Sequence, residues 1–316
     1  MMRSILIIFS LAIVLSCTSQ QTQQSPKPKW LWTIEYSPDD KYVAFGGDDS
    51  LLRIHTVSDQ KLYKSFKLNT AIKGMSWHPE SNLLAIATMK GVEIFNLKNE
   101  TFFKVEGLTT GGRGIKWNRN GQLLGLADGH GVVQIINRDG KLIKSIKKHN
   151  NNSYLTLDWH PLKEVIATGT DEIILFDTSG KQLAFFKHRK ENTGVLTLRW
   201  HPSGEFLASG DYGHDKEGVP TLLQFWKEDG TLLRSMTGSN AEYRNIRWNK
   251  DGSAIATASD GLRIWSKDGK LLHHGKTKDL LWGVSWNKDD SKIITASFDG
   301  NIYLWTNKAT QIPNSF

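Results

Sequence analysis

The chain has 316 residues, a formal net charge of +8 and one cysteine. A single cysteine excludes a fold held together by disulfide bonds, so burial of apolar side chains must stabilise the body, as this length allows. The charge is modest beside 23% charged residues, and the lysines are dispersed along the chain, which argues against a nucleic-acid-binding protein.

Residues 1–16 are typical of a secretory signal peptide. A short basic start precedes an apolar run over residues 5–15, which is too short to span a bilayer as a helix. Ser16 and Cys17 end the letters VLSC, which resemble the lipobox of bacterial lipoproteins, whose cysteine is lipidated and becomes the new N-terminus. An ordinary signal peptide with a chance cysteine is the alternative. We favour lipidation of Cys17, because an exported protein rarely keeps one odd thiol.

Residues 17–29 are expected to form a polar tether that follows the lipidated cysteine. Residues 18–29 are rich in Gln, Ser and Pro, a composition that gives an extended linker. Two or more acyl chains on Cys17 would hold the protein firmly at a membrane. In bacterial lipoproteins, Asp after the cysteine retains the protein at the inner membrane. The resemblance therefore implies that Thr18 directs this protein to the outer membrane of the cell envelope.

Residues 30–316 contain seven near-copies of one pattern. Each copy reads apolar-x-apolar-x-Trp, then a polar turn, then an apolar run that ends in Ala or Gly. Successive anchors are 41, 40, 42, 41, 48 and 38 residues apart. A repeat of this period cannot bury its apolar face alone, so neighbouring repeats must stack. The seven structural anchors are Tyr36, Trp77, Trp117, Trp159, Trp200, Trp248 and Trp286.

Each repeat is predicted to form four short strands. In the fourth repeat, Leu155, Leu157 and Trp159 alternate with polar residues, which is the period of a strand. His160 and Pro161 then turn the chain, and the runs EVIATG, EIILFD and QLAFF follow between polar turns. Four such strands indicate an up-and-down antiparallel sheet.

Two motifs of the repeat resemble those of WD-repeat proteins. They are the His-Pro turn after the anchor and the apolar-Trp ending of the third strand at Trp226, Trp265 and Trp305. The Trp-Asp pair is altered, since Ser266 follows Trp265, and the usual Gly-His pair before the first strand is missing. The resemblance implies an all-β, seven-bladed β-propeller of four-stranded antiparallel blades. It also implies that the family's hydrogen-bond tetrad is broken in most blades.

One arc of the ring carries the candidate binding face. Trp32 and Trp282 lie four residues before the anchors of repeats one and seven, which are neighbours in a closed ring. In WD-repeat proteins this position lies near the mouth of the central channel. Aromatic side chains flanked by cations suit sugars, peptides or anionic groups. Alternatively, both tryptophans fill the gap where the ring closes. The candidate face contains Trp32, Lys73, Arg113, Tyr154, Tyr243, Arg244 and Trp282.

Two further sets of residues are expected to be structural. Residues one position before each anchor should face the channel or pair between blades: Glu35, Ser76, Lys116, Asp158, Arg199, Arg247 and Ser285. The histidines that follow three anchors, His78, His160 and His201, lie in equivalent turns of separate blades. Metal ligands must converge on one ion, so these histidines are not expected to bind one.

The fifth repeat carries a charged insertion between its second and third strands. Asp211, His214, Asp215 and Glu217 offer oxygen and nitrogen ligands for a metal, although they lack the spacing of a known calcium loop. The alternative, which we favour, is a solvated loop.

No signature of an enzyme occurs in the sequence. We therefore expect a non-enzymatic, lipid-anchored scaffold of the bacterial cell envelope that binds a protein partner or an envelope glycan, contacts the membrane through its lipid and needs no cofactor. The alternative function is a propeller hydrolase or lyase with a metal at the channel mouth. A third is an assembly subunit like the propeller lipoproteins of outer-membrane biogenesis.

Ring closure is predicted to use the C-terminal tail. Residues 20–24, which have the spacing of an added N-terminal strand, are polar and have little to bury. Residues 308–316 contain Ile312 and Phe316, and Pro313 is tolerated on an edge strand. The tail should therefore supply a short fourth strand to the seventh repeat.

Overall fold

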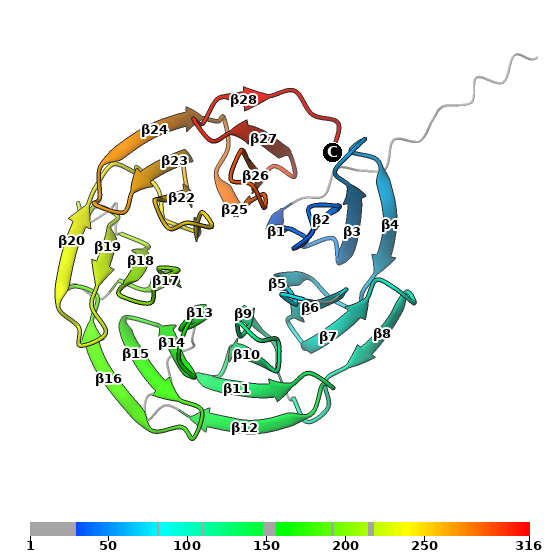
Figure 1. Cartoon of the computed structure of the whole chain (residues 1–316), viewed down its shortest axis with the longest axis horizontal. Coiled ribbons are helices and arrows are strands. Elements are labelled where there is room, and N and C mark those ends of the chain that lie inside the picture. The colour runs from blue at the N-terminus through cyan, green and yellow to red at the C-terminus, as the bar shows by residue number, and fades with distance from the viewer. Residues whose placement is uncertain (1–29, 81, 109, 148–155, 191–192, 214–217) are drawn as a thin grey trace, which may run out of the picture.

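In the computed structural model, residues 30–80, 82–108, 110–147, 156–190, 193–213 and 218–316 are described. Within these ranges the chain forms strands and turns and no helix, and thus no helix long and apolar enough to cross a membrane. The signal peptide, Cys17 and the tether lie outside the described residues. Seven four-stranded antiparallel sheets form a ring around a central channel (Figure 1), which confirms the expected all-β, seven-bladed propeller.

The first four blades follow the first four repeats. Blade one contains β1 (Leu31–Tyr36), β2 (Tyr42–Gly47), β3 (Leu51–Thr56) and β4 (Leu62–Lys67). Blade two contains β5 (Ile72–Trp77), β6 (Leu83–Thr88), β7 (Gly91–Asn96) and β8 (Thr101–Lys104). Blade three contains β9 (Gly112–Trp117), β10 (Leu123–Asp128), β11 (Val132–Asn137) and β12 (Leu142–Lys147). Blade four contains β13 (Thr156–Trp159), β14 (Val165–Gly169), β15 (Glu172–Asp177) and β16 (Gln182–Lys187).

The last three blades complete the ring. Blade five contains β17 (Val195–Trp200), β18 (Leu207–Asp211), β19 (Leu223–Trp226) and β20 (Leu232–Met236). Blade six contains β21 (Asn245–Trp248), β22 (Ala254–Ala258), β23 (Gly261–Ser266) and β24 (Leu271–Lys276). Blade seven contains β25 (Leu281–Trp286), β26 (Lys292–Ser297), β27 (Ile302–Thr306) and β28 (Gln311–Ile312).

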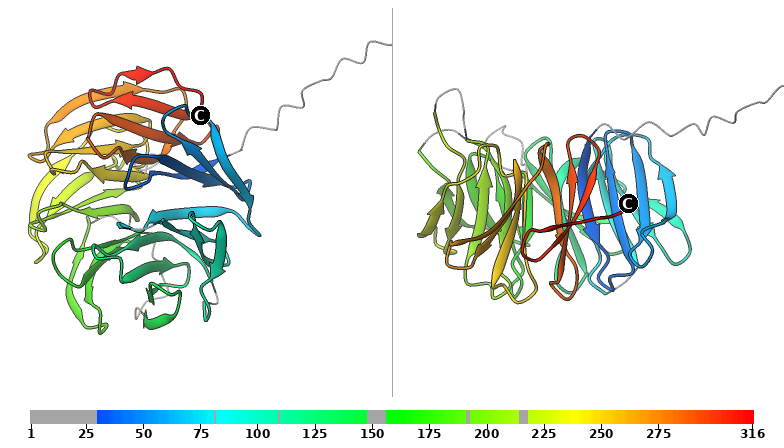
Figure 2. Two further views of the ribbon diagram at one scale, coloured as in Figure 1. Left: turned by 45° about the vertical axis from the view of Figure 1, so that its right-hand side comes forward. Right: turned by 90° about the horizontal axis from the view of Figure 1, so that it is seen from above.

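Every blade is one contiguous stretch of chain. In each sheet the four strands pair in sequence order, and the first strand lines the channel while the fourth lies at the rim (Figure 1). Seen edge-on, the strands run between the two faces of the ring (Figure 2). The loops that enter the innermost strands therefore gather at one mouth of the channel.

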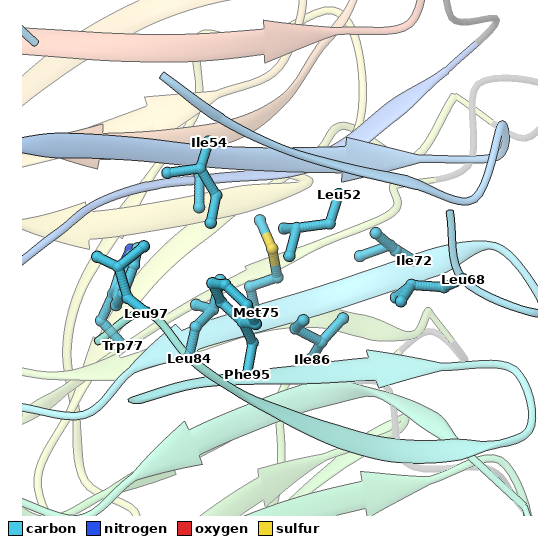
Figure 3. Close-up of a cluster of buried hydrophobic side chains, with 11 residues drawn as sticks. Leu52, Ile54, Leu68, Ile72, Met75, Trp77, Leu84, Ile86, Phe95 and Leu97 are labelled. Carbon is cyan, nitrogen blue, oxygen red and sulfur yellow. The ribbon is translucent and has the colours of Figure 1, made fainter. Parts of the chain in front are cut away.

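The apolar core lies between neighbouring blades. In Figure 3, Leu52 and Ile54 of blade one pack against Ile72, Met75 and Trp77 of blade two. Blades one and seven share a similar cluster, which includes Leu31, Ile34 and Tyr36 from one side and Ile294, Ala296 and Leu304 from the other. Each blade buries its apolar faces only against its neighbours, as the repeat period requires.

The C-terminal tail closes the ring. In β28, Ile312 pairs with Leu304 of β27, and Gln311 pairs with Trp305, so the tail supplies the fourth strand of blade seven. The chain then crosses to blade one, where the Ser315 amide donates to Gln60 Oε1 over 2.6 Å. Phe316 joins the cluster shared by blades one and seven. These contacts confirm the predicted C-terminal strand.

Candidate binding site at the channel mouth

A shared irregularity of the innermost strands positions the candidate face. Leu31 pairs with Gly47 and Thr33 pairs with Gly46, so Trp32 is an extra residue in β1. The same register shift occurs at four equivalent positions, Lys73, Arg113, Leu196 and Trp282. A β-bulge of this kind re-aims a side chain out of the alternating pattern. These five residues and Arg244 line one hollow at the mouth.

Lys73 and Trp32 are held together by one carboxylate. Asp48 Oδ1 accepts a hydrogen bond from Trp32 Nε1 and another from Lys73 Nζ, each over 2.7 Å. Lys73 Nζ also lies 3.7 Å from the centroid of the Trp32 ring, within cation–π distance. This part of the mouth is therefore preorganised and electrically balanced.

Two arginines from opposite sides of the ring meet above the channel. Arg113 Nη2 approaches the carbonyl oxygen of Arg244 at 3.5 Å, although the two residues belong to blades three and six. The Arg244 guanidinium carbon lies 4.7 Å from the Trp282 ring centroid and 5.5 Å from that of Tyr212. Arg244 forms an ion pair with Glu242. Burial, and next the charge of Arg244, lower the pKa of Arg113 to about 10.

The tryptophan pair is part of the ring-closing core rather than an open platform. Trp32 and Trp282 have ring centroids 4.3 Å apart, and Trp282 is only 5% exposed. Trp30 and Phe298 stack on each other at 4.8 Å and cover it. These two covering residues, 38% and 36% exposed, are open aromatic side chains, as is Tyr212 beside Arg244, which is 40% exposed. Sequence reasoning left Trp30 and Phe298 out of the face, although Trp30 lies only two residues before Trp32.

Tyr243 does not lie on the binding face. Its side chain is 0% exposed and packs with Phe225, Ile246 and Trp265 in the core between blades five and six. Burial raises its pKa well above the usual range. The expectation failed because Tyr243, which directly precedes β21 together with Arg244, turns into the core while Arg244 lines the hollow. Tyr154 lies outside the described residues.

Residues one position before the anchors link the blades below the mouth. Ser76 Oγ accepts a hydrogen bond from the Trp117 amide at 3.2 Å, and Asp158 Oδ2 accepts one from the Trp200 amide at 2.8 Å. Ser285 Oγ accepts one from the Tyr36 amide across the closure, at 3.2 Å. These side chains therefore join blade two to three, blade four to five and blade seven to one.

The residues one position before the anchors also place cations deep in the channel. Glu35 forms an ion pair with Arg247, whereas Lys116 and Arg199 form none with the carboxylates of the described residues. Burial, and next the charge of Arg247, lower the pKa of Arg199 to about 9. Burial also lowers the pKa of Lys116.

Neighbouring innermost strands approach each other closely at this level. Gly74 lies in an innermost strand, and a Cβ there would lie 2.2 Å from the carbonyl oxygen of Arg113 on the next blade. The hollow that the mouth residues line has a volume of about 40 Å³. That volume holds roughly three water molecules, because each needs about 10–15 Å³. The hollow therefore offers little room for a sugar ring or a peptide backbone, and a larger ligand would contact the mouth mainly from above.

Asp211 belongs to a buried structural network instead of an open metal site. Its Oδ2 contacts His188 Nε2 at 3.1 Å and Arg189 Nη1 at 2.9 Å, and its Oδ1 accepts from the Leu222 amide at 2.8 Å. Burial alone would raise the pKa of Asp211, but the hydrogen bond and charge of His188 outweigh it and lower the pKa. No group of three metal-ligating side chains occurs in the described part of the chain. His214, Asp215 and Glu217 lie outside that part.

Blade five keeps a complete WD-type tetrad. Trp226 Nε1 donates to Ser209 Oγ at 2.8 Å, Ser209 Oγ contacts His188 Nδ1 at 3.0 Å, and His188 contacts Asp211. Sequence reasoning missed it because Lys187, not glycine, precedes His188. The Ser-His-Asp order resembles a hydrolase triad. All three side chains are buried, however, and the indole of Trp226 occupies the serine oxygen.

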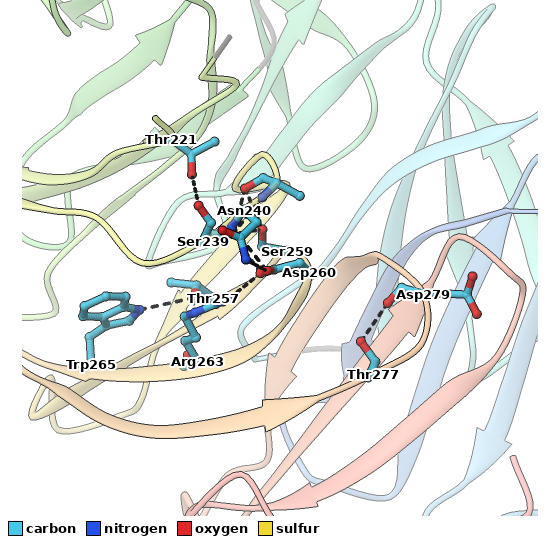
Figure 4. A network of polar contacts seen from close by, with 11 residues as sticks. Thr221, Ser239, Asn240, Thr257, Ser259, Asp260, Arg263, Trp265, Thr277 and Asp279 are labelled. Carbon is cyan, nitrogen blue, oxygen red and sulfur yellow. Dashed lines mark hydrogen bonds and ion pairs between the residues drawn. The ribbon is translucent and has the colours of Figure 1, made fainter. Parts of the chain in front are cut away.

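Blades six and seven keep only parts of this network. In blade six, Trp265 Nε1 donates to Thr257 Oγ1 at 3.4 Å, and Ser239 occupies the place of the histidine beside Asp260 (Figure 4). Arg263 supplies the charge partner of Asp260 at 2.5 Å. In blade seven, Trp305 Nε1 donates to Thr295 Oγ1 at 2.9 Å. The expected loss of the tetrad therefore holds in these blades but not in blade five.

The histidines of the His-Pro turns connect neighbouring blades. His78, His160 and His201 each place Nε2 2.9–3.1 Å from the carbonyl oxygen of a turn glycine on the next blade: Gly121, Gly204 and Gly252. The Nδ1 atoms accept backbone amides of their own turns. Nε2 must donate and Nδ1 must accept, so the rings are neutral. These histidines are structural.

Two known family models match parts of the chain. The Anaphase-promoting complex subunit 4 WD40 domain matches residues 34–106 and 75–161, and the WD domain, G-beta repeat, matches residues 180–217 and 265–306. Eukaryotic translation initiation factor 3 subunit I from Phaeosphaeria nodorum is 37% identical over 60 residues, which is 19% of this chain. The aligned stretch spans 18% of that relative's length.

Proposed function

We propose that the chain is a non-enzymatic scaffold of the WD-repeat propeller type that binds a partner protein on the channel-mouth face; the WD40 matches and the seven-bladed fold support this. Propellers of this kind generally bind protein partners and are typically non-catalytic. The exposed pair Trp30 and Phe298 carries the proposal, since it packs on Trp282, whose ring centroid lies 4.7 Å from the Arg244 guanidinium carbon. Aromatic anchors beside arginine are typical of protein interfaces.

Crosslinking in the native envelope tests this proposal. The double substitution Trp30→Ala, Phe298→Ala should abolish crosslinks to the partner, because it removes these two open aromatic side chains. Phe185→Ala is the control, since Phe185 is an even more exposed aromatic on the outer strand of blade four, away from the mouth. Unchanged crosslinks in the double variant would rule out this face. Binding of purified envelope polysaccharide, lost in the double variant, would assign the face to a glycan.

We also propose that the scaffold is lipid-anchored at Cys17 in the bacterial cell envelope, at the outer membrane. The support is the short apolar run that ends in VLSC, together with the polar stretch that follows. Cys17→Ser should release the protein from the membrane into a soluble fraction, measured by fractionation and immunoblotting. A substituted protein that stays in the membrane with its leader uncut would instead indicate a plain membrane anchor.

The alternative function as a hydrolase or lyase with a channel-mouth metal has less support. Asp211, the described residue on which it depends, uses its carboxylate to hold His188 and Arg189 and is fully buried. Metal analysis of the purified protein provides an independent test: one stoichiometric calcium or zinc per chain would revive the alternative.

A further inference from the structure

The channel mouth holds more positive than negative charge. Six cations line the mouth and the level below it: Lys73, Arg113, Lys116, Arg199, Arg244 and Arg247. Three of them are neutralised by ion pairs to Asp48, Glu242 and Glu35. Of the described carboxylates, only Asp158 remains near the other three, and it accepts the Trp200 amide. The surplus amounts to two positive charges.

Donor groups of the arginines remain without acceptors. Nε of Arg199 and Nε of Arg244 are buried and have no hydrogen-bond partner among the described residues. A buried donor without an acceptor costs about 1–3 kcal/mol, and more when the group is charged. Arg113 Nη2 reaches the carbonyl of Arg244 only at 3.5 Å, and Tyr212 is its other side-chain partner.

The positive charges of these arginines also repel one another. The charge of Arg244 contributes to the lowered pKa of Arg113, and the charge of Arg247 contributes to that of Arg199. A cation in the hollow would increase this repulsion, and a neutral group would leave it unchanged. An anion would reverse this repulsion and could accept hydrogen bonds from the guanidinium groups that line the hollow.

We propose that the hollow at the channel mouth binds one oxyanion group, a carboxylate or a phosphate, between Arg113 and Arg244 with Arg199 beneath. The volume of about 40 Å³ suits the head group of a side chain or a small free ion, and excludes a larger molecule. The inference rests on the proposed function when the oxyanion is an aspartate or glutamate of the partner protein. Trp30 and Phe298 would then contact the residues around that acidic side chain.

Calorimetry on the full-length protein tests the oxyanion site. The probes are inorganic phosphate, the capped peptide acetyl-Gly-Glu-Gly-amide and its neutral twin acetyl-Gly-Gln-Gly-amide, at low ionic strength, where screening is weak. Arg113→Gln should weaken phosphate or glutamate binding at least tenfold. Arg234→Gln is the control, because Arg234 is an exposed cation on the outer strand β20 whose contacts are to backbone carbonyls.

The results with the different probes distinguish the possible sources of the oxyanion. Binding of the glutamate peptide without its neutral twin assigns the site to an acidic side chain, whereas binding of phosphate alone assigns it to a free ion. The proposal is overturned when neither probe binds, or when Arg113→Gln and Arg234→Gln weaken binding equally. Near-ultraviolet circular dichroism confirms that Arg113→Gln is folded.

Partner crosslinking separates failure of this inference from failure of the scaffold. If an acidic residue of the partner inserts into the hollow, Arg113→Gln should lose its crosslinks to the partner. Suppose that Arg113→Gln still crosslinks to the partner while Trp30→Ala, Phe298→Ala does not. The proposed binding face would then stand, and insertion of an acidic partner residue into the hollow would be refuted.

Discussion

Single indoles carry a large share of the stability at the residue scale. Trp159 is buried, and its Nε1 donates to the carbonyl oxygen of Lys116 on the neighbouring blade over 2.9 Å. Trp282 is buried to a similar degree, although its Nε1 has no partner among the described residues. Both side chains therefore act as packing residues between blades.

Replacing either indole by alanine should be similarly costly. We expect Trp159→Ala and Trp282→Ala each to lower the free energy of unfolding by about 3–5 kcal/mol, the usual loss for a buried tryptophan. Trp30→Ala is the control and should lose much less, because Trp30 is partly exposed. Urea denaturation followed by circular dichroism measures all three. A loss for Trp282→Ala as small as that for Trp30→Ala would restore Trp282 as an open binding residue.

The inter-blade histidines should make the fold sensitive to acid. Burial lowers the pKa of His78 and His160 below the unfolded value of about 6.5. Below that pH the unfolded chain binds more protons than the folded one, so stability falls as pH decreases from about 6.5 towards the folded pKa values. The urea midpoint should therefore drop between pH 7.5 and 5.5. His160→Gln should flatten this slope, and an unchanged slope in that variant would contradict the mechanism.

At the scale of elements, the four-residue network makes blade five distinctive. Asp211 balances His188 and Arg189 where the side chains are almost fully buried. Breaking such a buried arrangement by removing one partner typically costs about 3–5 kcal/mol.

Asp211→Ala should therefore lower stability by about that amount. Asp268→Ala, an exposed aspartate in the turn of blade six, should stay within about 0.5 kcal/mol. Denaturation midpoints give both values, and metal content measured on the same samples should not change. Bound metal that disappears together with the Asp211 side chain would return this residue to the metal hypothesis.

At the scale of elements, the strands could be predicted from the sequence, whereas the β-bulges and the role of His188 could not. The alternation in each repeat predicts four strands, and the polar turns locate their ends. Neither the alternation nor the turns reveal a β-bulge, because a bulge depends on the pairing register between two strands. The equivalence of Trp32, Lys73 and Arg113 was thus visible in the sequence, whereas their departure from strand alternation was not. The role of His188 in the blade-five network could not be predicted for another reason. A hydrogen-bond partner is defined by its position in space, and the glycine that usually precedes this histidine is absent.

At the scale of the whole molecule, the repeat period alone predicts the ring. Seven repeats of about 40 residues give seven blades, and the apolar Ile312 and Phe316 identify the closing tail. The charge surplus of the channel could not be predicted, because it depends on which carboxylates reach which cations across the ring. Glu35 meets Arg247 of blade six, 212 positions away along the chain.

Removing the tail should weaken the closure. Deleting residues 308–316 removes β28 and the contacts of Phe316, so the outer edge of β27 and the flank of blade one become exposed. Hydrogen exchange should rise in blades one and seven, and the urea midpoint should fall. Deleting residues 18–26 is the control and should change neither. Protection lost on removal of the N-terminal segment, with no effect of the tail deletion, would place closure at the other terminus.

The contiguity of the blades has a consequence for how the protein is made. Because no blade borrows a strand from another, each blade can pair its strands once its own stretch of chain has emerged. Only the joint between blades one and seven must wait for residues at the far end of the chain. A polypeptide that stops short of Gln311 lacks β28, so the outer edge of β27 beside this joint has no partner strand. We expect proteases to cleave such unfinished molecules faster than finished ones.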